Sequence, residues 1–291
     1  MVLRVRIKTH SLFIHLKQCR TSMRELDTPA SDSYNQRFGG TRRLYGNSEV
    51  EILRAAHVCV IGIGGVGSWA AEALARSGVG ELTLIDMDDV CVTNINRQIH
   101  AMTGTIGQSK IEVMAARIQL INPDCKVNLI DDFISPENQA QYLSKEFDYV
   151  LDAIDSLKAK ASLLAYCKSN KIKVITIGGA GGQTDPTQIQ VTDLTKTIQD
   201  PLARKLRETL RHHHNFTKNA KRKFGIDCVY STEHLKYPQA DGSVCAVKAT
   251  AEGPKRMDCA SGFGAATVVT ASFGFVAVAH IIKKLIEKHR Q

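Results

Sequence analysis

Residues 57–78 read HVCVIGIGGVGSWAAEALARSG, and this stretch decides the fold. The β-branched run at 57–61 is typical of a buried strand. The turn that follows holds four glycines, Gly62, Gly64, Gly65 and Gly67. Glycines at this spacing allow a tight turn and a close approach of the backbone to a ligand, and the N–H groups at the start of the next helix favour a phosphate. The stretch therefore predicts a strand, a phosphate-binding loop and a helix that Gly78 stops.

The same alternation of strand and helix continues along the chain. We expect strands at 57–61, 82–86, 127–130, 149–153, 173–177 and 189–191, and helices at 68–77, 110–121 and 156–170. Alternation of this kind predicts an α/β fold with a doubly wound, Rossmann-like, mostly parallel sheet. Ligands on such sheets bind at the carboxyl ends of the strands.

Four segments follow from this pattern. Residues 1–33 form an N-terminal extension that we expect to be disordered, and residues 34–194 form the nucleotide-binding domain. Residues 195–258 look like a basic crossover inserted over the carboxyl edge of the sheet. Residues 259–291 return to the core as a helix.

The charge of the chain is uneven. Its 38 Lys and Arg residues exceed its 29 Asp and Glu residues, for a formal charge of +9, and two basic segments, 1–22 and 201–223, account for the excess. The second of these fits a polyanion such as RNA, although charge runs are often only a solvated face. The candidate residues for binding such a polyanion are Arg204, Lys205, Arg207, Arg211, Lys218, Lys221, Arg222 and Lys223. The neighbouring run His212–His214 is interpreted as an exposed stretch, not as a metal site.

The cysteines and the apolar C-terminal stretch indicate the compartment. None of the eight cysteines is spaced Cys-x-x-Cys, so we expect no structural zinc, and their apolar surroundings indicate a reducing, cytoplasmic location. Residues 262–282 carry no charge and approach the length of a membrane span. Small residues such as Gly274 favour a buried, closely packed helix instead, and membrane association is the less favoured alternative.

Polar residues near the glycine loop indicate the chemistry. Asp86 ends the second strand, where a carboxylate accepts from ribose hydroxyls. The glycines alone do not separate NAD, FAD and ATP. Arg97, Lys110 and Asp155 follow, and such a set suits nucleotidyl transfer, because cations stabilise the charge on phosphorus and a carboxylate holds Mg²⁺.

These motifs resemble the ubiquitin-activating superfamily, whose members adenylate carboxylates. The resemblance rests on the glycine loop and on DMDDV at 86–90, NINRQ at 94–98, GQSK at 107–110 and DAID at 152–155. It implies that Asp86 binds ribose, that Arg97 and Lys110 contact phosphates and that Asp155 binds Mg²⁺. The implied ATP site comprises Gly62, Gly64, Gly65, Gly67, Asp86, Asp88, Asn94, Arg97, Gln98 and Lys110, and the implied catalytic residues are Arg97, Lys110 and Asp155.

Within the superfamily, the sulfur-carrier activators hold zinc with paired Cys-x-x-Cys motifs, and many members use an acceptor cysteine. This chain has no such pair and no cysteine between Cys167 and Cys228. It resembles instead the tRNA threonylcarbamoyladenosine dehydratase subfamily, through QRFGG at 36–40, GGAGG at 178–182, YPQADG at 237–242 and KRMDCASG at 255–262. The resemblance implies ATP-dependent dehydration of threonylcarbamoyladenosine beside the tRNA anticodon.

Two other functions remain as alternatives: an activator of a small sulfur-carrier protein, and a nucleotide- or NAD-binding module without activity. The superfamily often borrows an arginine across a homodimer, and Arg37, Arg42 and Arg43 are the candidates here. A monovalent cation and a sulfur-transfer protein are left open as further partners.

Overall fold

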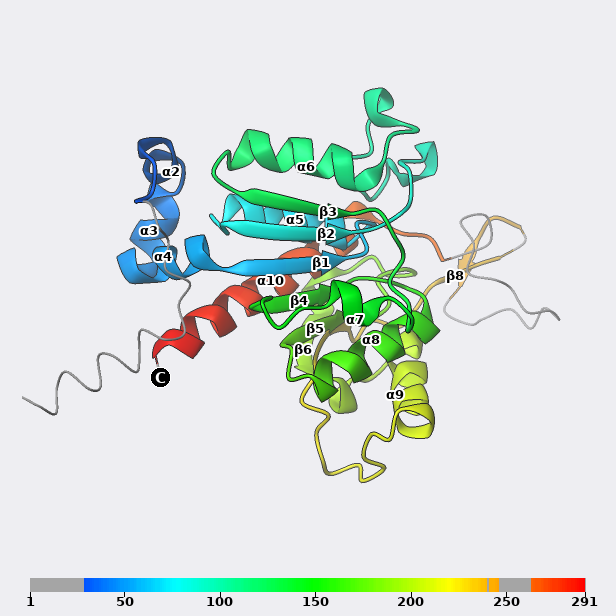
Figure 1. Ribbon diagram of the computed structural model, residues 1–291. Coiled ribbons are helices and arrows are strands. Elements are labelled where there is room, and N and C mark those ends of the chain that lie inside the picture. The colour runs from blue at the N-terminus through cyan, green and yellow to red at the C-terminus, as the bar shows by residue number, and fades with distance from the viewer. Residues whose placement is uncertain (1–28, 240, 246–262, 291) are drawn as a thin grey trace, which may run out of the picture.

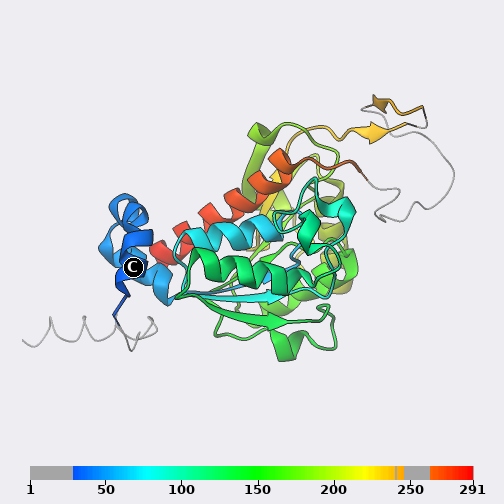
Figure 2. The ribbon, with the colours of Figure 1, turned by 90° about the horizontal axis from the view of Figure 1, so that it is seen from above.

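The computed structural model describes residues 29–239, 241–245 and 263–290, and these form one main sheet with helices on both faces and a separate small hairpin (Figures 1 and 2). The expectations for residues 1–28 and for the KRMDCASG stretch lie outside the described residues. The helices of the described part are α2 (Asp32–Arg37), α3 (Gly39–Tyr45), α4 (Asn47–Ala55), α5 (Gly67–Arg76), α6 (Lys110–Ile121), α7 (Gln139–Tyr142), α8 (Leu157–Ser169), α9 (Pro201–His213) and α10 (Thr267–Arg290), with short 3₁₀ turns η1 (Val92–Asn94), η2 (Thr103–Thr105), η3 (Pro186–Gln188) and η4 (Leu194–Lys196).

The sheet has seven strands in the order β3-β2-β1-β4-β5-β7-β6. Their bounds are β1 (His57–Ile61), β2 (Glu81–Ile85), β3 (Lys126–Ile130), β4 (Tyr149–Asp152), β5 (Val174–Ile177), β6 (Ile189–Asp193) and β7 (Asp227–Ser231). All neighbours pair in parallel except β6 and β7. The expected Rossmann-like, mostly parallel α/β fold is confirmed.

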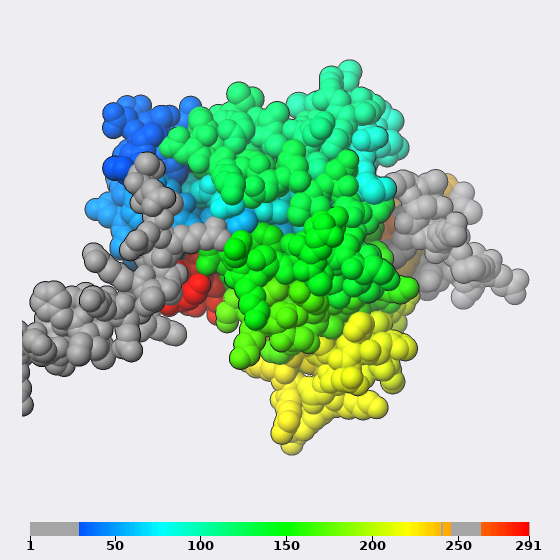
Figure 3. All heavy atoms as spheres, in the orientation of Figure 1, coloured from blue at the N-terminus to red at the C-terminus, as the bar shows by residue number. Residues whose placement is uncertain are grey.

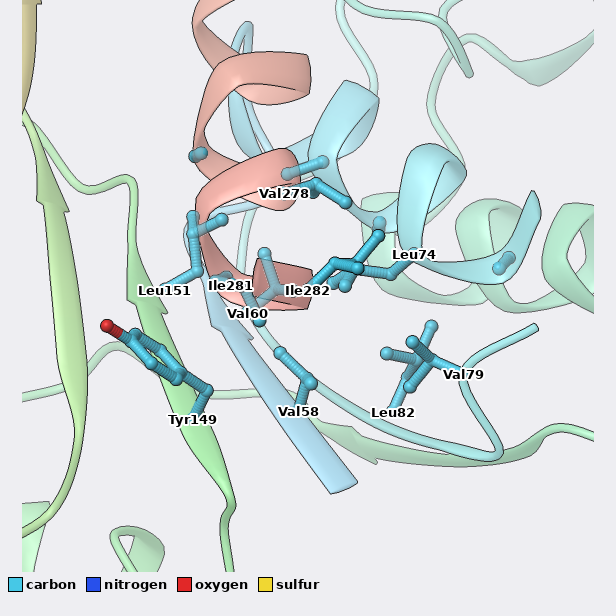
Figure 4. Close-up of a cluster of buried hydrophobic side chains, with 14 of the residues drawn as sticks. Val58, Val60, Leu74, Val79, Leu82, Tyr149, Leu151, Val278, Ile281 and Ile282 are labelled. Atoms are coloured by element: carbon cyan, nitrogen blue, oxygen red, sulfur yellow. The ribbon is translucent and has the colours of Figure 1, made fainter. Parts of the chain in front are cut away.

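Alternate residues of β1 face opposite layers, as the pleat of a strand requires. Val58 and Val60 pack with α5 and α10, while Cys59 and Ile61 pack against the layer of α8 and α9. Figure 4 shows Val58 and Val60 below Leu74 of α5 and the apolar side chains of α10. The central strand is thus buried on both faces, and its carboxyl end is left to hold the glycine loop.

α10 is long and apolar enough to cross a membrane by length and composition alone, since an 18-residue stretch of it has a mean hydropathy of 1.6. Within the protein, 61% of that stretch is buried. A Cβ at Gly274 would come within 2.9 Å of the Val66 carbonyl oxygen and 3.0 Å of the Ala70 nitrogen on α5. The small residue therefore serves close helix packing, as expected, although the helix begins only at Thr267.

β7 is the strand of the main sheet that sequence analysis missed. It lies inside the 195–258 segment, and it joins the main sheet between β5 and β6 instead of covering the sheet edge. Cys228, Val229 and Tyr230 are all buried, because helices cover both faces at this position. Only five residues long and flanked by glycine- and lysine-rich loops, the strand gives a weak pattern. A small hairpin of β8 (Tyr237–Pro238) and β9 (Val244–Cys245) follows it.

Candidate nucleotide-binding site

The glycine loop turns sharply between β1 and α5. Gly62 has φ +86°, and a Cβ there would lie 3.0 Å from the backbone carbonyl of Ala153. A Cβ at Gly67 would come within 1.8 Å of the Gly62 carbonyl oxygen, so no side chain fits. No side chain caps the first turn of α5 among the described residues. The Ser68 N–H donates to the Gly64 carbonyl at 3.1 Å, and the Gly67 N–H makes no backbone hydrogen bond outside the helix among the described residues. The helix dipole favours an anion at this end.

Asp86 closes the loop from β2. Its Oδ2 accepts the Ile63 N–H at 2.6 Å, and its Oδ1 accepts the Asp88 N–H at 2.9 Å. Burial raises the pKa of the Asp86 carboxyl above its usual value, while the charge of Lys110 acts in the opposite direction. Lys110 Nζ lies 4.0 Å from Asp86 Oδ1 and 2.6 Å from Asp88 Oδ2. Asp86, expected to bind ribose, and Lys110, expected to contact phosphates, thus lie close together beside the glycine loop.

The NINRQ segment lies on the other side of the loop. A Cβ at Gly65 would lie 3.5 Å from Arg97 Cδ, and one at Gly64 would lie 3.9 Å from Gln98 Nε2. Arg97 Nη1 donates to the Thr93 carbonyl at 2.7 Å and to Asn96 Oδ1 at 3.1 Å. Asn94 is buried, and its Oδ1 accepts the Cys91 N–H at 3.0 Å, which orders the start of the segment.

Residues far away in the sequence fix the backbone at Arg97. Trp69 Nε1 on α5 donates to the Arg97 carbonyl at 3.0 Å, and Thr270 Oγ1 on α10 donates to the same carbonyl at 3.4 Å. Asn96 Nδ2 donates to the Ala265 carbonyl at 3.0 Å. The sequence analysis missed these contacts, because nothing local in a sequence links Arg97 to a helix 173 residues away.

Asp155 lies in the turn between β4 and α8, next to the loop that Gly62 begins. Its side chain is exposed and makes no hydrogen bond or ion pair with the described residues. Below it, Lys160 Nζ lies 2.9 Å from Asp152 Oδ2 and donates to the Ile154 carbonyl at 2.9 Å. Thr176 Oγ1 donates to the same Asp152 oxygen at 2.7 Å. A fully buried network, unforeseen in the sequence, thus holds the turn that presents the free carboxylate.

Comparison with known proteins agrees with this geometry. The model of the ThiF family matches residues 40–291. The chain belongs to the ThiF family. The tRNA threonylcarbamoyladenosine dehydratase of Escherichia coli K12 is 67% identical over 258 residues, which cover 89% of this chain and 96% of that protein. Its counterpart in Haemophilus influenzae is 65% identical, with 88% of this chain and 96% of that protein covered.

A solved structure of the E. coli dehydratase in complex with ATP superposes with a TM-score of 0.80. The two chains are 58% identical over 90% of this chain and 98% of that one. Because a ThiF-family relative of this similarity holds ATP, the glycine loop, Asp86, Lys110 and Arg97 are the candidate ATP site of this chain.

The basic residues of the ThiF-family chain do not all face solvent. Arg207 donates to Thr197 Oγ1 and to the Leu194 carbonyl, and Arg211 lies 5.4 Å from the centre of the Phe224 ring. The remaining six predicted RNA-binding residues are exposed. They lie along α9 and in the loop after it, and these two segments form the yellow lobe in Figure 3. Because β7 runs parallel to β5, that loop reaches the amino edge of the sheet, and only Arg204 and Lys205 stay near the carboxyl edge.

The three candidate arginines lie at the far end of α5 from the glycine loop. Tyr34 donates to the Gly78 carbonyl at 2.6 Å and thereby fixes α2 to this end. Arg37 donates to Ser33 Oγ and to the Ile121 carbonyl, and Arg42 pairs with Glu51 at 3.1 Å. Arg43 is exposed and makes no hydrogen bond or ion pair with any described residue. α5 has 10 residues and is therefore about 15 Å long, so none of the three adjoins its own glycine loop.

The six cysteines among the described residues divide into two groups. Cys59, Cys125, Cys167 and Cys228 are buried, whereas Cys91 and Cys245 are exposed. Burial raises the pKa of the Cys167 thiol to about 12, which keeps it protonated at neutral pH. In the part of the chain that the structure describes, no group of three or more His, Cys, Asp or Glu side chains could hold a metal ion.

Proposed function

We propose that the protein catalyses the ATP-dependent dehydration of N6-threonylcarbamoyladenosine in tRNA. The observation that carries the proposal is the 67% identity to the E. coli dehydratase over 96% of that protein. The placement of one free carboxylate, one lysine and one arginine around a glycine loop supports it, because this set suits adenylation of a carboxylate.

In the proposed reaction, an oxygen of the threonyl carboxylate attacks the α-phosphorus of ATP and pyrophosphate leaves. The carbamoyl group then attacks the activated carbonyl carbon, the bond to AMP breaks, and a proton is released as the ring closes. The net change is the loss of water from the nucleoside and the cleavage of ATP. No protein thiol is needed, because the internal nucleophile is already held at a high effective concentration.

Each residue of the site has a proposed role in this sequence. Asp86 accepts from the ribose hydroxyls, and Lys110 moves from Asp88 to the phosphates, whose charge it stabilises together with Arg97. Asp155 is a free oxygen ligand of the kind that Mg²⁺ takes from proteins. Bound there, Mg²⁺ would neutralise charge on the phosphates. Residues 34–194 are thus proposed as the ATP-binding domain, with the exposed basic residues of 195–258 as the tRNA-binding part and 259–291 as core support.

We further propose that the enzyme is a cytoplasmic homodimer. Arg43 is the arginine best placed to act on a second copy, since it is exposed and unpaired among the described residues, and Leu44 beside it is 75% exposed. Mixing Arg43→Ala with Lys110→Ala protein tests this directly. Activity above that of either variant alone supports action across the dimer, and no recovery in mixed dimers excludes it.

Mass spectrometry of tRNA nucleosides tests the proposed function. Incubation with ATP and Mg²⁺ should convert the modified adenosine to a product lighter by one water, with one AMP formed per nucleoside. Asp155→Asn serves as the low-activity control. An unchanged nucleoside, together with pyrophosphate exchange that depends on a small carrier protein, would favour the sulfur-carrier activator. An unchanged nucleoside without any exchange would favour a binding module.

A further inference from the structure

The order of the strands shows from which side the substrate must arrive. Along the carboxyl edge of the sheet, Asp86 follows β2, the glycine loop follows β1, and Asp155 follows β4. Neighbouring strands lie about 4.8 Å apart, so these three positions form a line in which ribose, phosphates and metal follow one another. A carboxylate that approaches the α-phosphorus along this line comes from beyond β4. The next strand is β5, and the run Gly178–Gly182 follows it directly.

This second glycine run is closely enclosed by three other segments. A Cβ at Gly178 would lie 1.9 Å from Asp200 Oδ2, and the Gly179 N–H donates to that oxygen at 2.9 Å. The Gly182 N–H donates to the Gly264 carbonyl at 2.7 Å. The backbone between these anchors, 179–181, stays half-exposed. A Cβ at Gly179 would lie 3.7 Å from its nearest neighbour, Asp200 Oδ1, so the backbone here is less tightly packed than at Gly178. This half-exposed backbone lies at the carboxyl end of β5, next to the strand that leads to Asp155.

Two aromatic rings stand against the run. Tyr237 of β8 and Phe263 lie with their ring centres 5.1 Å apart and their planes tilted by 53°. A Cβ at Gly181 would lie 3.0 Å from Phe263 Cβ, which fixes the pair at the glycine run. Both residues are only partly buried, and Figures 1 and 2 show β8 projecting beyond the carboxyl edge of the sheet. Proteins that bind unpaired bases stack them on aromatic side chains of this kind.

Gln183 adds a buried side chain whose hydrogen-bond acceptor has no partner among the described residues. Its side chain is 96% buried, and its Nε2 donates to the Gly179 carbonyl at 2.9 Å. Its Oε1 is also buried and has no hydrogen-bond partner among the described residues. An unsatisfied buried acceptor is costly, so a ligand N–H that reaches this oxygen gains more than it would in water. The carbamoyl arm of the modified adenosine carries such N–H groups.

We propose that Gly179–Gly181, Gln183, Tyr237 and Phe263 form the subsite for the modified nucleoside. The unpaired purine stacks on the Tyr237 ring, Gln183 accepts from the carbamoyl arm, and the threonyl carboxylate passes over the glycine run to the phosphates beside Asp155. α9 starts at the same place, because its cap Asp200 contacts Gly178 and Gly179. Arg204 and Lys205 on its first turns then take the flanking phosphates. This inference rests on the proposed function.

The test uses the full-length protein and an anticodon stem-loop RNA that carries the modified adenosine. Tyr237→Leu should raise KM for this RNA roughly 10-fold, the size of effect that loss of one stacked base produces, whereas Tyr237→Phe keeps the ring and should stay near the wild type. Gln183→Leu should raise KM in the same direction. Affinity for ATP alone should not change in any of the three. Tyr166→Leu is the matched control, because Tyr166 is a half-buried tyrosine near the end of α8, at the amino edge of the sheet and away from the ATP site.

The outcomes separate the subsite from the proposed function. If the wild type cyclises the RNA and Tyr237→Leu and Gln183→Leu both keep its KM, the subsite is wrong and the proposed function stands. If the wild type does not cyclise the RNA, the proposed function fails first. Equal losses in Tyr237→Leu, Tyr237→Phe and Tyr166→Leu would also overturn the subsite, since they would reflect general damage. Weaker ATP binding in Tyr237→Leu would do the same.

Discussion

Asp152 and Lys160 form an ion pair in which both side chains are fully buried, with 2.9 Å between Asp152 Oδ2 and Lys160 Nζ. Burial raises the pKa of Asp152, and the charge of Lys160 opposes this shift. Because Lys160 also donates to the Ile154 carbonyl, the pair connects β4, α8 and the turn that carries Asp155. The position of the Asp155 carboxylate therefore depends on an ion pair that is fully buried.

Lys160→Met should lower the free energy of unfolding by about 3–5 kcal/mol, because it leaves the Asp152 carboxylate buried without its cation. Denaturant titration measures the loss. Lys158→Met on the exposed face of α8 is the matched control and should change stability by less than about 0.5 kcal/mol. Equal effects of the two substitutions would mean that the buried pair does not hold the turn.

Lys110→Ala and Arg97→Ala should each reduce turnover by about 10²–10³-fold and leave the fold intact, since each removes one preorganised donor from the phosphates. Single-turnover cyclisation of modified tRNA measures the effect. Lys126→Ala removes an exposed lysine that pairs with Glu81 and should keep wild-type turnover. If either active-site variant cyclised the nucleoside at the wild-type rate, the phosphate contacts would be assigned wrongly.

Asp155→Asn should raise the Mg²⁺ concentration needed for half-maximal activity and leave metal-free ATP binding nearly unchanged. The reason is that Asp155 is the one exposed carboxylate of the turn, and Mg²⁺ usually takes only one or two carboxylates from the protein. Titration of activity with Mg²⁺ measures this. If the titration curve of the variant matched that of the wild type, Asp155 would not be a ligand of Mg²⁺.

The sequence predicted the elements whose pattern is local and strong. The five-residue run of β1 and the 3.6-residue stripe of α6 are both found with the bounds expected from the sequence. β7 was missed, because its short run is apolar on both faces and has no period. Lys160 was missed for a related reason: on a helix it resembles a surface lysine until Asp152 is placed beside it.

The candidate site likewise contains residues that local motifs predicted and contacts that they did not. Motifs close together in the sequence placed Asp86 and Lys110 at the glycine loop, because the loop and both residues belong to successive βα units. The support of Arg97 by Trp69 and Thr270 depends on how distant segments pack. No local pattern encodes such contacts.

Asp227→Asn should lower stability by about 1 kcal/mol at pH 7 and have little effect in strong acid. His280 Nε2 lies 2.8 Å from Asp227 Oδ2, and this hydrogen bond holds the pKa of Asp227 below its usual value of 3.8. A carboxyl whose pKa is lower in the folded state stabilises it above the unfolded pKa, and this gain disappears as the pH falls through the folded value. The magnitude is that of a half-exposed hydrogen bond to a charged group.

Urea titrations between pH 3 and 7 measure this dependence. His280→Ala should show the same dependence on pH. Because both substitutions remove the same interaction, the loss of stability in the double variant should be smaller than the sum of the two single losses. A loss that is independent of pH would show that packing, not the carboxylate, connects β7 to α10.

The exposed loop after α9 should bind tRNA through phosphates and not through bases. Lys221, Arg222 and Lys223 are all exposed and lie at the amino edge of the sheet, far from the ATP site. Their joint change to Ala should weaken tRNA binding and reduce the slope of log affinity against log salt by about 0.7–0.9 for each phosphate that is no longer neutralised. Affinity for ATP should not change.

The matched control removes the same charge from the end of α10, with Lys283, Lys284 and Lys288 changed to Ala. Binding measured from about 50 to 200 mM salt decides the matter. Parallel lines for the loop variant and the wild type would leave Arg204 and Lys205, beside the carboxyl edge, as the basic residues that grip the RNA.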